Sequence, residues 1–152
     1  MPPTIRPRTT HDLITCVTLL RHVHEASGYP VNWPADPQLW LTPPNALSCW
    51  VITVNNEVAG HLAVTQTDSA ALVERLFVDP QQTGQGLGRK LLDHARRTAA
   101  EHHLDLTLEV ADNCTAAIAL YRRAGWRETA RTPIDWGGDQ ASAVISFSAP
   151  SS

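Results

Sequence analysis

Three glycines at alternate positions stand between a predicted strand and a predicted helix, in the stretch 76–92. The apolar strand stops at Pro80, because proline cannot donate to a sheet ladder. Gly84, Gly86 and Gly88 follow, and an apolar stripe at helical spacing begins directly after them. Backbone N–H groups that no Cβ atom crowds can point at a phosphate, and the helix dipole adds a favourable potential. The stretch therefore predicts an anion site at the start of a helix.

Two commoner phosphate-binding motifs do not fit this stretch. A dinucleotide-binding fingerprint needs its third glycine at position 89, which is occupied by Arg89. A P-loop needs Gly-Lys and then Ser or Thr after four intervening residues, and the chain does not have them here. Taken alone, the glycines are better explained by a turn that binds no ligand.

The segment 106–126 contains a second group of residues suited to chemistry: Leu-Glu-Val at 108–110, then Asn113, Tyr121 and a Gly-Trp pair at 125–126. Together with the stretch 76–92 it resembles the GNAT superfamily of N-acetyltransferases. That family has Arg/Gln-x-x-Gly-x-Gly/Ala between a strand and a helix. It then has a strand ending in Leu-Glu-Val, an Asn, and a Tyr before a Gly-Phe pair. Here Thr83 stands at the first position of the first pattern, and Trp126 replaces the Phe.

The resemblance implies that the anion is the pyrophosphate of acetyl-coenzyme A, used as a cosubstrate without a metal ion. Thr83 replaces the usual Arg or Gln, so one side-chain contact to the pyrophosphate differs from the family pattern. The glycines still permit the backbone to surround the pyrophosphate. Asn113 is equally suited to capping a helix. The residues expected to bind the cofactor are Phe77, Val78, Thr83, Gly84, Gln85, Gly86, Leu87, Gly88, Arg89, Asn113 and Tyr121.

Acetyl transfer from a thioester requires a neutral amine, a stabilised oxyanion and a protonated thiolate leaving group. A lysine-like amine with a pKa near 10.4 is neutral in only about one molecule in a thousand near pH 7.4, so a base is useful. The resemblance implies that Tyr121 is the acid and that Glu109 is the base, as in the ribosomal-protein branch of the family. Glu74, on the preceding strand, competes with Glu109. The alternatives are a core tyrosine at 121 and a solvated strand residue at 109.

Hydrophobic periodicity predicts the elements that position these residues. The first helix is expected to begin at Thr9 or Thr10 as N-cap and to bury a stripe that includes Ile14, and Asp112-Asn113 is expected to cap the last helix. We expect strands at 4–8, 48–54, 57–66, 71–78, 104–110, 126–131 and 141–147, and helices at about 9–24, 87–102 and 113–124.

This order predicts an α+β fold in one domain spanning 1–152. Its central sheet is mixed, mostly antiparallel, with six to seven strands flanked by helices and a parallel crossover from the fourth strand to the fifth. The expected arrangement is similar to the GNAT fold.

The segment 28–45 differs in character from the rest of the chain. Five prolines disfavour a long helix or a central strand, apart from a helical turn at 36–41. Trp33 and Trp40 offer rigid faces for an aliphatic stem or a cation, and Asp36 is placed to meet an ammonium or to cap the turn. We expect this segment to form one wall of the acceptor pocket; the alternative is a plain cover over the core.

A formal net charge of −3 argues against nucleic acid or an anionic membrane as the main partner. Three cysteines without close pairs fit a reducing compartment. No apolar run has the length of a signal peptide core or a membrane span, so we expect a cytoplasmic protein.

The sequence therefore predicts an N-acetyltransferase that acts on a primary amine. A small-molecule acceptor is favoured, and a protein N-terminus is the alternative; a homodimer is compatible with either. An acyl-coenzyme A-binding regulatory module without turnover and a nucleotide-binding domain are the competing classes.

Overall fold

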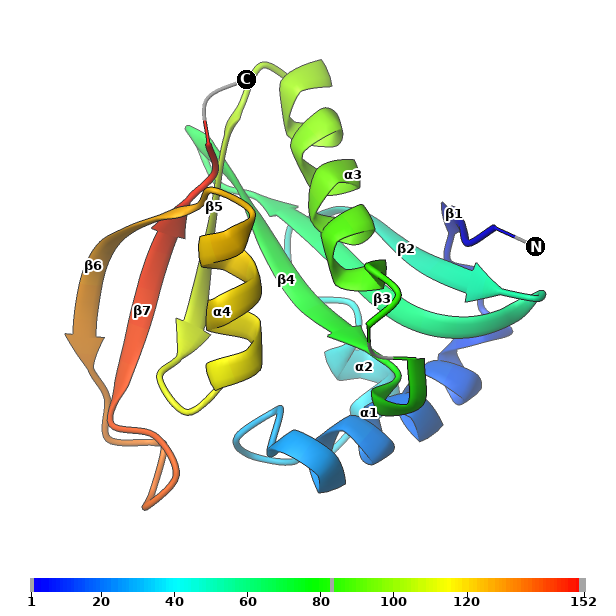
Figure 1. The fold of residues 1–152 in the computed structure, drawn as a ribbon, viewed down its shortest axis with the longest axis horizontal. Helices are drawn as coiled ribbons and strands as arrows, with labels where there is room; N and C mark the ends of the chain where they lie inside the picture. Colours follow the sequence, from blue (N-terminus) through cyan, green and yellow to red (C-terminus); the bar gives the residue numbers. More distant parts are fainter. Residues whose placement is uncertain (1, 83, 151–152) are drawn as a thin grey trace.

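Within the described residues, seven strands form one sheet in the order β1-β2-β3-β4-β5-β7-β6 (Figure 1). The structure is a computed structural model that describes residues 2–82 and 84–150. The strands are β1 (Thr4–Pro7), β2 (Ala46–Val54), β3 (Glu57–Gln66), β4 (Ala70–Val78), β5 (Asp105–Ala111), β6 (Arg127–Pro133) and β7 (Ala143–Ser148). The helices are α1 (Asp12–Ser27), α2 (Pro37–Trp40), α3 (Leu87–Glu101) and α4 (Thr115–Arg123), with a 3-10 turn η1 at Pro80–Gln82.

The sheet is mixed, as the sequence predicts. β1 to β4 are antiparallel neighbours, and Asn55 and Asn56 turn β2 into β3 with φ values of 52° and 67°. Asparagine tolerates this left-handed region better than most residues do, which explains the tight hairpin. After α3 the chain returns as β5, which runs parallel to β4, and β7 then lies between β5 and β6.

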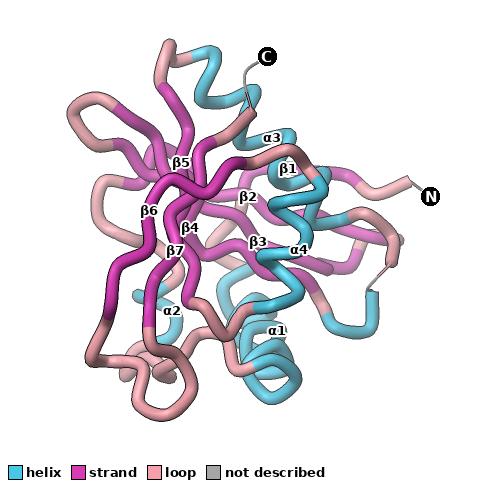
Figure 2. Tube along the Cα trace, turned by 60° about the vertical axis from the view of Figure 1, so that its left-hand side comes forward, coloured by secondary structure: helices cyan, strands magenta, loops and turns pink. Residues whose placement is uncertain are grey.

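The helices cover the sheet in two layers. Side chains alternate along β2, so Trp50 and Ile52 pack in a cluster with α3 and α4, whereas Val51 packs in a second cluster with α1. Figure 1 shows α3 and α4 in front of the sheet, and Figure 2 shows the strands as one continuous twisted layer between the helices. None of the helices within 2–82 and 84–150 is long and apolar enough to cross a membrane.

The start of α1 differs from the expectation. Neither Thr9 nor Thr10 is the N-cap, a place taken by His11 without a side-chain hydrogen bond. Instead the Asp12 carboxylate accepts hydrogen bonds from Thr9 N at 2.7 Å and from Arg6 at 2.7 and 3.0 Å. Ile14 is 68% exposed, and the buried stripe instead consists of Cys16, Leu19, Leu20 and Val23, with Asp12 also buried.

The start of α4 also differs from the expectation. Its N-cap is Cys114, and neither Asp112 nor Asn113 caps it. The Asp112 carboxylate is occupied by Ser142, accepting from the main-chain N at 3.0 Å and from the hydroxyl at 2.8 Å. The bond ties the turn after β5 to the start of β7.

Candidate functional site

Strands β4 and β5 separate halfway along their length. Their pairing runs from Ala70 opposite Asp105 to Val73 opposite Leu108 and ends there, although β4 continues to Val78 and β5 to Ala111. Figure 1 shows the two arrows diverging towards their C-terminal ends. The backbone groups beyond Val73 and Leu108 that face this opening are available to a ligand.

A bulge in β4 accounts for the separation. The register with β3 shifts between His61 opposite Phe77 and Ala63 opposite Glu74, so β4 has one extra residue there. Arg75 has a positive φ of 53°, which is uncommon for a residue other than glycine. A bulge bends its strand and increases the local twist, and this one begins directly after the last pair with β5. The signal in the sequence is Glu74-Arg75, which breaks the alternation of an otherwise apolar strand.

Two carboxylates lie at the point of separation. The β4–β5 register, continued by one residue, sets Glu74 opposite Glu109. Burial raises the pKa of Glu74; the nearby Arg75 opposes this rise, and the negative charge of Glu109 adds to it. Glu109 is exposed, and within 2–82 and 84–150 neither carboxylate forms an ion pair or a hydrogen bond. Both are therefore available to a cationic ligand.

Tyr121 reaches this region from α4. It is 6% exposed, and its ring packs against Trp126 and Phe147. Its hydroxyl bonds to no other described residue. Burial raises the pKa of Tyr121, and the nearby acidic groups of Tyr29 and Cys114 raise it further. The hydroxyl is therefore protonated at neutral pH.

Tyr29 approaches from the other layer and was not singled out by the sequence. Its ring lies 6.1 Å from that of Trp40 and 6.4 Å from that of Phe77. Burial raises its pKa as well, Arg75 opposes the rise, and Cys114 and Glu74 add to it. Tyr29 therefore lies close enough to Glu74 for its pKa to respond to that carboxylate, and the pKa of Tyr121 responds in turn to Tyr29 and Cys114.

The glycine turn lies at the open end of this region. Gly86 is the N-cap of α3 with a φ of 74°, and a Cβ placed on it would meet no atom within 4 Å. The first N–H groups of a helix have no partner inside it, and here they belong to Leu87, Gly88 and Arg89. A Cβ on Gly88 would come within 2.8 Å of Leu120, so this glycine serves the packing of α3 against α4.

The other expected cofactor residues have varied surroundings. Phe77 is buried and stacks on His61, and the half-buried Val78 packs against the cluster that contains α3, so the Phe77 side chain is not free to meet a ligand. Gln85 donates to Gln82, and Arg89 is exposed and pairs with Asp93 at 3.5 Å. Asn113 accepts a weak bond from the Cys114 thiol at 3.7 Å, and its amide lies beside Gly28 at the end of α1. Thr83 lies outside the described residues.

Of the three residues expected to meet the acceptor, Trp40 is nearest to the separated strands. The Arg75 guanidinium lies 4.0 Å from its ring centre. Trp33 instead lies against α1, beside Arg21 and His24. Asp36 caps α2 by accepting from Leu39 N at 3.1 Å.

An exposed tryptophan that the sequence did not single out stands beside this segment. Trp136, in the β6–β7 loop, is 50% exposed, and its carbonyl accepts from the Asn32 amide at 3.0 Å. This bond joins segment 28–45 to the β6–β7 loop.

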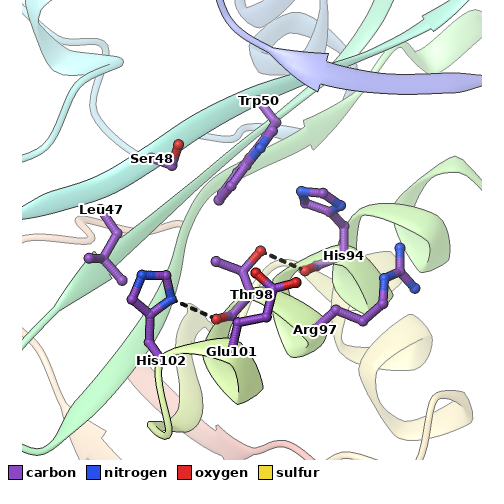
Figure 3. Close-up of a pocket in the computed structure, with 8 residues that line it drawn as sticks. All are labelled: Leu47, Ser48, Trp50, His94, Arg97, Thr98, Glu101 and His102. Carbon is purple, nitrogen blue, oxygen red and sulfur yellow. Dashed lines mark hydrogen bonds between the residues drawn. The ribbon is translucent and has the colours of Figure 1, made fainter.

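A separate pocket of about 420 Å³ lies between the start of β2 and the C-terminal half of α3 (Figure 3). Two of its polar side chains bond to the backbone of α3: Thr98 donates to the His94 carbonyl, and His102 donates to the Thr98 carbonyl. Among the residues that the structure describes, His94 Nε2 is enclosed without a hydrogen-bond partner, and its ring meets Trp50 edge-on with the ring centres 4.7 Å apart. Within 2–82 and 84–150, no three His, Cys, Asp or Glu side chains gather in a way that could hold a metal ion.

Comparison with known proteins gives one family. The model of the Acetyltransferase (GNAT) family matches residues 16–126. The peptidyl-lysine N-acetyltransferase YjaB of Salmonella typhimurium is 32% identical over 87 residues, which are 57% of this chain and 54% of that protein. The chain thus matches about half the length of this curated relative.

Solved structures share the fold over nearly the whole chain. The ribosomal-protein-S18-alanine N-acetyltransferase of Escherichia coli has a TM-score of 0.76 at 25% identity, covering 98% of this chain and 94% of that one. A putative streptothricin acetyltransferase of Bacillus anthracis, in complex with acetyl coenzyme A, has a TM-score of 0.73 at 17% identity and covers 100% of both chains.

Proposed function

Since the chain belongs to the Acetyltransferase (GNAT) family, we propose that it transfers an acetyl group from acetyl-coenzyme A to the nitrogen of a primary amine. The observation that carries the proposal is the separation of β4 from β5 beyond Val73 and Leu108. The carboxylates of Glu74 and Glu109 lie on the two separating strands, the phenols of Tyr29 and Tyr121 approach from opposite layers, and the N-terminus of α3 stands at the open end. A regulatory module without turnover would not need this combination.

The residues around the glycine turn fit acetyl-coenzyme A. Open space over Gly86 and the free N–H groups at the start of α3 suit a pyrophosphate, and Arg89 and Lys90 supply exposed positive charge. Among the described residues, the edge of β4 that faces β5 has no strand partner beyond Val73, and it suits the amide groups of the pantetheine arm. Bound acetyl-coenzyme A supplies an activated thioester carbonyl to the site.

Tyr121 is proposed as the acid. Its raised pKa keeps the hydroxyl protonated, and the hydroxyl has no competing partner among the described residues. It is therefore able to donate a proton to the sulfur that leaves as the amide forms.

Glu74 is proposed as the base, with Glu109 as the alternative that the sequence favours. A carboxylate with a raised pKa is the stronger base, and Glu74 is half-buried while Glu109 is exposed. Glu74 also lies on the bulge, close to Tyr29 and Arg75. In its ionised form it attracts the acceptor ammonium and takes its proton.

The acceptor is proposed to be a primary amine on a flexible aliphatic stem, of which a lysine side chain within a peptide is the first to test. Two carboxylates favour a cation, and the exposed Trp136 and the part of the Trp40 ring that Arg75 leaves uncovered offer surfaces that suit an aliphatic stem. The Salmonella relative named above is a peptidyl-lysine N-acetyltransferase, which supports this choice. A small-molecule amine with the same stem, favoured by the sequence, is the second candidate.

A coenzyme A thiol-release assay over a panel of amines tests the proposal. The panel holds a lysine peptide with a blocked N-terminus, a lysine-free peptide with a free N-terminus, free lysine and a linear polyamine. We expect release that depends on the amine and is fastest with the blocked lysine peptide. Fastest release with the free N-terminus or the polyamine would reassign the acceptor. Binding of acetyl-coenzyme A in a thermal-shift assay without release on any amine would indicate the regulatory module instead.

A further inference from the structure

A buried histidine next to the proposed site has both ring nitrogens engaged. His61, on β3, is 0% exposed, and its ring stacks on Phe77 with the centres 5.1 Å apart. Its Nδ1 lies 2.9 Å from the carbonyl oxygen of Arg75, and its Nε2 lies 2.8 Å from Nη1 of Arg8. The proposed chemistry assigns no role to this residue.

The partners settle which nitrogen bears the hydrogen. A guanidinium only donates, so His61 Nε2 accepts from Arg8, and Nδ1 donates to the carbonyl of Arg75. Burial lowers the pKa of His61 to about 4, and although the bond to Arg75 opposes this, the charges of Arg8 and Arg75 add to it. The imidazole is therefore neutral at physiological pH and keeps one donor and one acceptor.

Each side of the imidazole leads to a different part of the site. The Arg75 carbonyl belongs to the bulge that directly follows Glu74. The Arg75 side chain donates from Nε to the Trp40 carbonyl at 2.8 Å. Arg8 donates to the Leu41 carbonyl at 2.9 Å and also to the Thr42 hydroxyl.

Two arginines thus hold the consecutive carbonyls with which α2 ends, and carbonyls at a helix end have no partner inside the helix. His61 joins these two arginines. Through them a single buried ring connects the bulge beside Glu74 to the wall that carries Trp40.

We propose that His61 is a positioning residue for acetyl transfer. Its Nδ1 holds the β4 bulge in place, and its Nε2, through Arg8, holds the segment that carries Trp40 and forms the proposed wall of the acceptor site. This inference rests on the proposed function, because it assigns the bulge to catalysis and the wall to acceptor binding. A phenyl ring at this position could fill the core and keep the stack on Phe77, but it could form neither of the two hydrogen bonds.

Substitutions that keep one hydrogen bond at a time separate the two effects. The amide of Asn reaches the place of Nδ1, so His61→Asn keeps the donor to the Arg75 carbonyl and loses the acceptor for Arg8. The amide of Gln reaches the place of Nε2, so His61→Gln keeps the acceptor for Arg8 and loses the donor to Arg75. We expect His61→Asn to raise the acceptor KM on the order of tenfold with kcat near wild type. We expect His61→Gln to lower kcat by a similar factor with KM near wild type. If both variants instead lower kcat and raise the acceptor KM by the same factors, in proportion to a fall in Tm, the proposal is overturned.

A measurement that needs no turnover protects the test against variants that fold poorly. Arg8 is only partly buried, so Arg8→Met removes the hold on Leu41 and Thr42, and with it the donor to His61 Nε2, without deleting an apolar side chain of the core. Amide hydrogen exchange in segment 38–42 is expected to accelerate in Arg8→Met. The matched control is Arg21→Met, which removes the cation from the Trp33 face, 5.0 Å away, and no carbonyl bond.

The outcomes distinguish this inference from the proposed function. Exchange in 38–42 that is as slow in Arg8→Met as in Arg21→Met would overturn the positioning role alone. A wild-type protein that acetylates no amine would overturn the proposed function, and with it the catalytic assignment of His61. Accelerated exchange in Arg8→Met together with the split between kcat and KM supports the whole inference.

Discussion

Tyr121 and Glu74 have opposite tasks in the proposed reaction, and burial serves both. Taking a phenol and a carboxyl out of water disfavours the charged form of each, so both pKa values rise. A higher pKa keeps Tyr121 protonated as an acid and makes Glu74 a stronger base. Partial exclusion of water therefore shifts the pKa of both groups in the direction that the proposed reaction requires.

Replacement of Tyr121 by phenylalanine tests the acid. The change removes one hydroxyl and leaves the contacts of the ring with Trp126 and Phe147. We expect kcat to fall about a hundredfold, within the range for loss of a general acid, with acetyl-coenzyme A affinity near wild type. Steady-state kinetics and calorimetry on the same preparation measure both. An unchanged kcat would leave Tyr121 as a core tyrosine.

The pH dependence of kcat/KM tests the base. The native pKa of Glu74 is raised above the ordinary value of 4.5, so its carboxylate form is lost as pH falls through this raised pKa. The acid limb of the profile should therefore lie at a higher pH than an ordinary glutamate would give. Glu74→Gln should lower the rate and remove this limb, whereas Glu109→Gln should keep it. If Glu109→Gln alone abolishes the limb, Glu109 is the base.

At the scale of elements, the turn between β4 and α3 can be tested without disturbing the core. Gly86→Val introduces a branched side chain where the pyrophosphate is proposed to lie, at a strain of about 1–2 kcal/mol for a positive φ. We expect acetyl-coenzyme A affinity to fall on the order of a hundredfold, equivalent to two charge-assisted hydrogen bonds of about 1.5 kcal/mol each, with the fold retained.

Gly138 provides the matched control for this substitution. It also has a positive φ, of 59°, and open space around its missing Cβ, but it lies in the β6–β7 loop. Gly138→Val carries the same backbone strain and should bind acetyl-coenzyme A like wild type in calorimetry. Equal affinity in the two variants would remove the glycine turn from the site.

The first turn of α1 depends on the ion pair of Asp12 with Arg6. These hydrogen bonds hold the pKa of Asp12 well below its ordinary value of 3.8. The resulting stability is complete above that value and is lost as pH falls below it. Asp12→Ala should lower the free energy of unfolding by about 2 kcal/mol at pH 7 and by less near pH 3. Denaturant titrations at both pH values measure this difference, and a loss that does not shrink in acid would contradict it.

At the scale of the molecule, periodicity predicted the order of elements and the mixed sheet because these depend on local patterns. The inner face of α3, for example, is marked by Leu87, Leu91, Ala95 and Ala99, all of them buried. The exposure of Ile14 and the burial of Asp12 beside Arg6 were not predicted, because apolar periodicity carries no information about an ion pair between β1 and α1. The place of Tyr29 at the site was not predicted, because its neighbours come from β4, α2 and α4, which are distant in the sequence.

The candidate site is assembled from both helical layers, which is why sequence motifs describe only part of it. The glycine turn and Tyr121 belong to the α3–α4 side, and short motifs predicted them. Trp40, Arg75 and His61 belong to the α1–α2 side, where long-range hydrogen bonds join the elements. The roles of Glu74 and Glu109 stay predictions that the paired variants decide.

Transfer of a labelled acetyl group tests the central claim most directly. Acetyl-coenzyme A labelled in the acetyl group is incubated with the protein and a lysine peptide with a blocked N-terminus, and the products are analysed by mass spectrometry. The account predicts that the label is on the lysine side-chain nitrogen with one free thiol per acetyl group, and that transfer is strongly reduced with Gly86→Val and Tyr121→Phe but not with Gly138→Val. Label found only as free acetate, or transfer that is as fast in Gly86→Val as in wild type, would contradict it.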